Sequence, residues 1–108
     1  MEKFKIGSAV VFALASAAAI ELETSESKSV VTIDLEEDAT LALSSDALPS
    51  PGDELILKVS SDATARDLTL GTGITAPVIA GVINKTKVQS FVYDGGNFIA
   101  TGAPVQID

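Results

Sequence analysis

The strongest constraint on the fold is a hairpin pattern near the carboxyl end of the chain. Two runs rich in β-branched and aromatic residues, Lys87 to Tyr93 and Phe98 to Thr101, flank the loop Asp94-Gly95-Gly96-Asn97. Glycine and asparagine accept the positive φ angles of tight hairpin loops, and β-branched and aromatic side chains favour strands. The pattern predicts a β-hairpin, and with it a β protein.

A second strand signal runs through residues 3 to 22. Large apolar residues fall mostly at even positions, and small or charged residues at odd positions. A period of two indicates strands, because helical spacing would scatter the large residues around the axis. A single strand is seldom this long, so we expect a bend or a second strand beginning near Ser16 to Ala18.

The same residues allow an alternative interpretation. Two lysines, an apolar stretch and small residues at positions 15 to 19 also fit a secretory signal with its cleavage site. The alternation favours strands over this signal. The apolar run is also shorter than the ~20 residues of a bilayer-spanning helix.

The remaining chain consists of short alternating segments separated by turns. We expect an acidic turn at Glu36 to Asp38, a long loop at Ser45 to Glu54 and an edge strand through Val105 and Ile107. Ala76 to Ile83 is apolar except for Gly81, so either both its faces are buried or one lies against another subunit. Many short strands spaced by turns predict one all-β domain over residues 1–108, an antiparallel, jelly-roll-like β-sandwich or barrel. Residues 1–22 would form a long N-terminal strand or docking arm, and residues 23–108 the sandwich body.

Composition removes several classes of function. The chain has no Cys and no His, which excludes thiol chemistry and zinc–thiolate sites and removes the commonest general base. Fifteen acidic residues against seven basic ones give a net charge of −8, the wrong sign for holding a nucleic-acid backbone. Ten of the acids lie between Glu21 and Glu54, so we expect this stretch to face solvent. We predict no enzyme, no cofactor, no metal and neither a nucleic-acid nor a membrane partner.

Several polar clusters are candidate sites that we interpret as turn chemistry. The acids at residues 36–38 do not follow a calcium-loop pattern, and we interpret them and the acids at 46, 53 and 54 as solvated turns. Asp62 and Asp67 are candidates for paired carboxylate chemistry, but short polar side chains in turns bond to their own backbone, so we interpret them as structural. A phosphate loop is followed by a helix, but no helix pattern follows Gly71-Thr72-Gly73, so we do not interpret it as a phosphate loop. Lys85 and Lys87 share one strand face, which we interpret as protection against edge pairing.

Residues 53 to 102 carry a family resemblance. A Pro-Gly-Asp-Glu turn enters a strand, a Ser-Ser-Asp turn leads to Arg-Asp-Leu-Thr-Leu-Gly-Thr-Gly, and Phe-Val-Tyr-Asp-Gly-Gly-Asn-Phe ends the run. This order resembles the small all-β structural proteins of tailed-phage virions, namely head decoration or cement proteins and head-fibre modules. The resemblance implies a non-enzymatic protein on the outer capsid surface of the virion, a homotrimer, with the major capsid protein as its partner.

The apolar segments are the expected contact surfaces, because a small sandwich does not readily hide this much apolar surface. The assembly-contact candidates are Val10, Phe12, Leu14, Val78, Ile79, Val82 and Ile83. Two other functions compete with capsid decoration. A fibre or tail adhesin recognising a host-surface glycan predicts a solvent-exposed aromatic such as Tyr93 or Phe98. An exported bacterial β protein would lose its first 19 residues.

Overall fold

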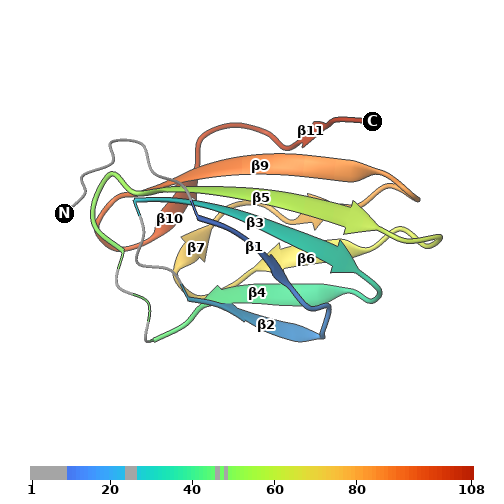
Figure 1. Cartoon of the computed structure of the whole chain (residues 1–108), viewed down its shortest axis with the longest axis horizontal. Coiled ribbons are helices and arrows are strands. Elements are labelled where there is room, and N and C mark those ends of the chain that lie inside the picture. Colours follow the sequence, from blue (N-terminus) through green and yellow to red (C-terminus); the bar gives the residue numbers. More distant parts are fainter. Residues whose placement is uncertain (1–9, 24–26, 46, 48) are drawn as a thin grey trace.

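A computed structural model of the chain describes residues 10–23, 27–45, 47 and 49–108, with side chains from Ala13 onward (Figure 1). These residues form a β-sandwich of two sheets without any helix, so none of the described residues belongs to a helix long and apolar enough to cross a membrane. The strands are β1 (Val10–Leu14), β2 (Ala19–Leu22), β3 (Lys28–Leu35), β4 (Ala39–Leu43), β5 (Glu54–Ser61), β6 (Asp67–Leu70), β7 (Ile74–Thr75), β8 (Ile79–Ala80), β9 (Thr86–Tyr93), β10 (Phe98–Ala100) and β11 (Val105–Gln106).

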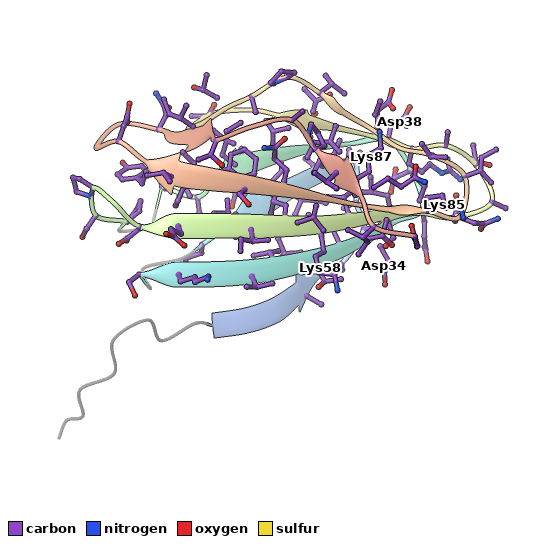
Figure 2. The ribbon with its side chains drawn as sticks, turned by 90° about the horizontal axis from the view of Figure 1, so that it is seen from above. Asp34, Asp38, Lys58, Lys85 and Lys87 are labelled. Carbon is purple, nitrogen blue, oxygen red and sulfur yellow. The ribbon has the colours of Figure 1, made fainter. Side chains whose placement is uncertain are left out.

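The first six strands alternate between the two sheets. Sheet A has the order β1-β3-β5-β9-β10-β7, with β11 also paired to β9, and sheet B has the order β2-β4-β6-β8. Figure 2 looks onto sheet A, where β1, β3, β5 and β9 lie next to one another. The neighbours β1, β3 and β5 are parallel, as are β2, β4 and β6, because each connection between them passes through a strand of the other sheet.

The expected all-β sandwich is confirmed, but the expectation of antiparallel strands throughout is wrong. Antiparallel pairing is confined to β5 with β9, β9 with β10 and β11, and β6 with β8 among the described pairs. The physical reason lies in the turns. The turn at Glu36 to Asp38 leads the chain from β3 in sheet A across to β4 in sheet B, whereas a hairpin would return it to sheet A.

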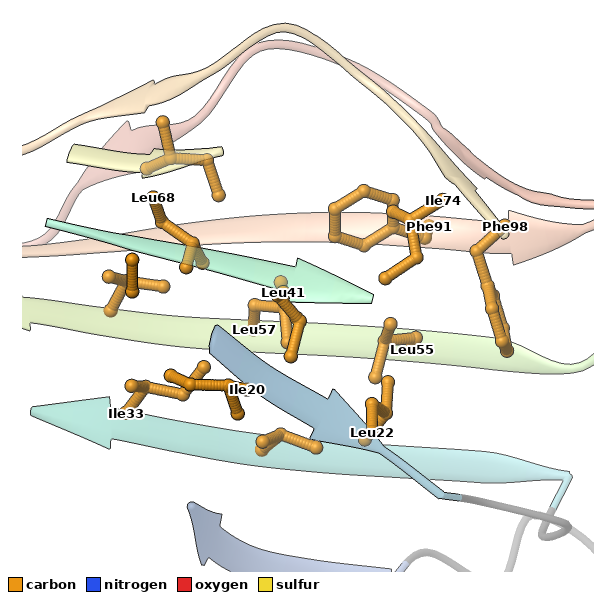
Figure 3. Close-up of a cluster of buried hydrophobic side chains, with 14 of the residues drawn as sticks. Ile20, Leu22, Ile33, Leu41, Leu55, Leu57, Leu68, Ile74, Phe91 and Phe98 are labelled. Atoms are coloured by element: carbon orange, nitrogen blue, oxygen red, sulfur yellow. The ribbon is translucent and has the colours of Figure 1, made fainter. Parts of the chain in front are cut away.

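The core lies between the two sheets (Figure 3). Leu55 and Leu57 of β5 and Phe91 of β9 face Leu41 of β4 and Leu22 of β2, and all five side chains are at most 1% exposed. Complete burial of a Leu or Phe side chain contributes about 1.5–3 kcal/mol before conformational entropy is subtracted. The period of two in each strand therefore sets which residues face inward.

The amino-terminal prediction of two strands is confirmed for the described residues. β1 pairs with β3, β2 pairs with β4, and the chain bends at residues 15–18, where the Glu36 backbone N–H donates to Ser16 Oγ at 2.9 Å. Residues 10–22 thus belong to the sandwich itself. Of the expected N-terminal strand or docking arm over residues 1–22, residues 1–9 lie outside the described residues.

The hairpin prediction is also confirmed. β9 and β10 are antiparallel and joined at Asp94 to Asn97, with Gly95 at φ 107°. Asp94 Oδ1 accepts hydrogen bonds from the backbone N–H groups of Gly96 at 2.8 Å and Asn97 at 2.9 Å. These two donors stabilise the carboxylate, Asn97 more strongly, and lower the pKa of Asp94.

Candidate functional site

The predicted contact residues of the apolar run fall in two different environments. Ile79 is 1% exposed and packs in the core, so its side chain does not reach the surface. Val78, Val82 and Ile83 are exposed, and they flank the short strand β8. The expectation that both faces of Ala76 to Ile83 are buried is therefore wrong, because only part of the run enters a strand. The alternative, contact with another subunit, stays a prediction.

The predicted contact residues of the N-terminal strand lie in β1. The backbone of Val10 is in register with Ser29 and that of Phe12 with Val31, but the side chains of these two candidates lie outside the described residues. Leu14 is half-buried and packs against the core. Its side chain is already engaged within the chain.

Two of the described acids bond to the backbone of their own turns: Asp53 accepts from the Ser50 N–H at 2.8 Å and Asp62 from the Thr64 N–H at 3.0 Å, while Asp46 lies outside the described residues. No group of three or more acids in the described part of the chain could hold a metal ion. Asp62 accepts two hydrogen bonds from Arg66, at 3.0 Å from Nε and 3.1 Å from Nη2, and this contact lowers the pKa of Asp62 and raises that of Arg66. Asp67 donates its backbone N–H to Asp38 Oδ1 at 3.0 Å. Lys87 lies in β9, which pairs on both sides, so the interpretation of an edge strand is wrong there.

The aromatic pair does not match the adhesin alternative. Phe98 is 1% exposed, and Tyr93 is half-buried against it, with ring centroids 5.0 Å apart and planes tilted by 56°. A glycan platform needs an aromatic face open to solvent, whereas this pair fills the end of the core.

The outer face of sheet A carries large apolar side chains. They alternate with core residues along each strand, and pairing brings them together: Val30 is in register with Ile56, Val92 with Ile99, and Val88 with Val105. We call this set of six residues the apolar face. Val92, Ile99 and Val105 are 37%, 39% and 60% exposed, and the other three are half-buried.

Charged residues interrupt the apolar face along β5, where Glu54 is in register with Val92 and Lys58 with Val88. Glu54 and Lys58 stand two residues to either side of Ile56, and Glu54 also pairs with Lys28 at 3.9 Å. Figure 2 shows Lys58 close to Asp34, its diagonal neighbour on β3. A shallow hollow of about 210 Å³ lies beside Ile56. It is lined by Glu54, Leu55, Ile56, Ser90, Phe91, Val92 and Thr101.

The outer face of sheet B has a different character. Its outward residues are small, polar or acidic: Ala19, Glu21, Thr40, Ala42, Asp67, Thr69 and Ala80. Sandwich surfaces that meet water normally have this composition. Large apolar side chains on an outer face are therefore found on sheet A and not at the described outward positions of sheet B.

A buried glutamine positions one side of the apolar face. Gln89 is 3% exposed, and its Nε2 donates to the carbonyl oxygen of Gly102 at 2.7 Å and to that of Ser90 at 3.1 Å. Gly102 lies in the bend between β10 and β11, which both pair with the same edge of β9. The amide thus anchors the bend that brings Ile99 and Val105 to the same face.

The six residues of the apolar face were not among the predicted contact residues. The signal was present, because Leu55-Ile56-Leu57, Val30-Val31 and Phe91-Val92 place apolar residues on both faces of their strands. Comparison of the chain with protein family models, curated proteins and solved structures found no match. The family resemblance therefore has no support beyond the residues that suggested it.

Proposed function

We propose that the chain is a non-enzymatic structural protein of a virion, a capsid decoration or cement protein that binds and reinforces the outside of a phage head through subunit contacts. One observation carries the proposal. The outer face of sheet A carries six Val and Ile side chains among charged and polar ones, while the outer face of sheet B carries only small, polar or acidic side chains at its described outward positions. An exposed apolar surface of this kind is typical of a protein that binds another subunit.

The dimensions and energetics suit such a contact. A specific interface of standard size buries about 800 Å² on each partner, and the molecule is 45 Å long and 26 Å wide. Burying apolar area contributes about 25 cal/mol per Å² before association costs are subtracted. Burial of the apolar face between subunits of a decoration layer would reinforce a particle without any covalent or metal-dependent step.

The test is sedimentation of the purified chain with phage heads that lack a decoration protein. We expect the wild-type chain to sediment with the heads at micromolar concentration. The double variant Ile56→Thr/Val92→Thr keeps β-branched side chains but removes two apolar contacts, and we expect it to bind about tenfold more weakly.

The comparison variant is Val78→Thr, which makes the same kind of change at an assembly-contact candidate outside the apolar face. We expect its binding to stay within threefold of wild type. A wild-type chain that does not sediment with any head would refute the function, and an equal loss in the comparison variant would refute the assignment of the contact to sheet A.

A further inference from the structure

We propose that the apolar face of sheet A packs against the same face of a second copy of this chain, around a two-fold axis that passes over Ile56. This inference deepens the proposed function, on which it rests, by naming the subunit that covers the face. A two-fold contact requires a self-complementary surface, in which each residue faces its symmetry partner across the axis.

The order of residues along β5 meets this requirement. Alternate residues of a strand point to the same face of its sheet. On the outer face of β5 these residues are Glu54, Ile56 and Lys58, with Ile56 at the centre. An axis over Ile56, lying between the sheets and perpendicular to the strands, stacks β5 on the antiparallel β5 of the second copy. Each Glu54 then faces Lys58 of the other copy, and the two Ile56 side chains meet on the axis.

The neighbouring strands follow the same axis. Ile56 is in register with Val30 on one side and with Ser90 on the other. Val88 and Val92 stand two residues to either side of Ser90, so the axis exchanges them. It also exchanges their partners Val105 and Ile99.

The residues that the proposed axis brings together therefore have compatible chemistry. Valine and isoleucine meet valine and isoleucine, and both charged pairs bring opposite signs together. No two like charges of β5 face each other.

The twist of the sheets preserves these central pairs. Sheets packed face to face lie about 10 Å apart and cross at about 30°. Two residues span about 7 Å, so the rotation displaces Glu54 from Lys58 of the second copy by about 3.5 Å. Long Glu and Lys side chains accommodate that displacement.

Other surfaces of the described chain fit a second copy less well. Pairing two β2 edges antiparallel would bring together exposed Glu21 side chains of both copies, because they lie on the outer face of a four-residue strand. Val78, Val82 and Ile83 are exposed, but no paired charges of opposite sign border them on β8. The apolar face is the described surface that combines apolar area with self-complementary charge.

A charge exchange tests the two-fold contact. The oligomeric state is measured by sedimentation velocity over a concentration series, with thermal unfolding as the check on folding. We expect wild type to form dimers. Glu54→Lys alone and Lys58→Glu alone each place like charges across the interface, and we expect each to weaken dimerisation at least tenfold. The double exchange Glu54→Lys/Lys58→Glu restores opposite signs, and we expect dimerisation within threefold of wild type.

The control is Lys28→Gln, which breaks the ion pair of Glu54 within the chain but faces no charge across the proposed axis. We expect its dimerisation to stay within threefold of wild type. A monomer, the trimer that the family resemblance implies, or a folded double exchange without rescue would each overturn the contact. Dimers that do not bind phage heads would instead refute the proposed function and leave the contact standing.

Discussion

Replacing Gln89 with Leu should loosen the carboxyl-terminal side of the apolar face while leaving the core packed. Leu has a similar size and suits a site that is 3% exposed, but it cannot donate a hydrogen bond. The Ser90 carbonyl keeps two other donors, the backbone N–H of Thr101 at 3.0 Å and its hydroxyl at 3.3 Å. The specific loss is therefore the 2.7 Å bond to the Gly102 carbonyl, which anchors the bend before β11.

The expected loss in the free energy of unfolding follows from the hydrogen bonds that the substitution removes and keeps. A hydrogen bond contributes a net 0.5–1.5 kcal/mol, and Gly102 is exposed, so water can satisfy its carbonyl after the substitution. We expect a loss of about 1 kcal/mol, which lowers the melting temperature by about 4–8 °C in a domain of this size. The larger effect should be local, in faster amide exchange at Ile107, whose backbone N–H donates to the Thr86 carbonyl oxygen at 3.1 Å.

Hydrogen exchange and thermal unfolding measure the two effects. Gln106→Leu is the matched control, because Gln106 is exposed and its Nε2 contacts only the nearby Asp108 carbonyl among the described bonds, at 3.0 Å. We expect the control to leave the melting temperature within about 2 °C of wild type. Unchanged exchange at Ile107 in Gln89→Leu would refute the anchoring role of Gln89.

Two further substitutions test the turns. A Cβ at Gly81 would lie within 3.0 Å of the Arg66 carbonyl oxygen and Ser61 Oγ, so Gly81→Ala should reduce the free energy of unfolding by about 1–3 kcal/mol, measured by thermal unfolding. The control Gly102→Ala should be nearly neutral, because a Cβ at Gly102 would meet nothing within 4 Å. Equal melting temperatures of the two variants would contradict the packing around Gly81. Asp94→Ala should lower the melting temperature at pH 7. Because folding lowers the pKa of Asp94, the carboxylate stabilises the fold above its unfolded pKa of about 3.9, and this stabilisation is lost as the pH falls through the folded pKa. The difference from wild type should therefore shrink towards pH 2, and a constant difference would contradict the linkage.

Local chemistry made the strands predictable from the sequence. The Asp94 to Asn97 loop needs residues that accept positive φ angles, and the two flanking runs have strong β preference, so the hairpin was predictable without tertiary information. The bend before Ala19 was predictable for a similar reason, since the alternation is longer than one strand. In both cases the deciding interactions lie within a few residues.

The sheet order was not predictable in this way. A polar turn such as Glu36 to Asp38 has the same composition whether the chain returns to its own sheet or crosses to the opposite one. The choice depends on which distant strand accepts the new one, and β4 lies between β2 and β6 in sheet B. Turn residues report that a strand ends, whereas long-range packing decides where the next strand lies.

The apolar face of sheet A bears on what strands with apolar residues on both faces indicate. Parallel strands usually carry apolar residues on both faces because both faces of a parallel sheet are covered. β5 has this pattern at Leu55-Ile56-Leu57, and β3 has it at Val30-Val31, yet sheet B covers only one face of sheet A. In sheet B, β2 and β6 instead alternate between core residues and small or charged ones, the pattern of strands with one face in water. Sheet A thus combines one apolar outward position on each of these strands, Val30 and Ile56, with charged outward positions beside them. A second copy placed over Ile56 would cover these apolar positions with the same residues that the first copy presents.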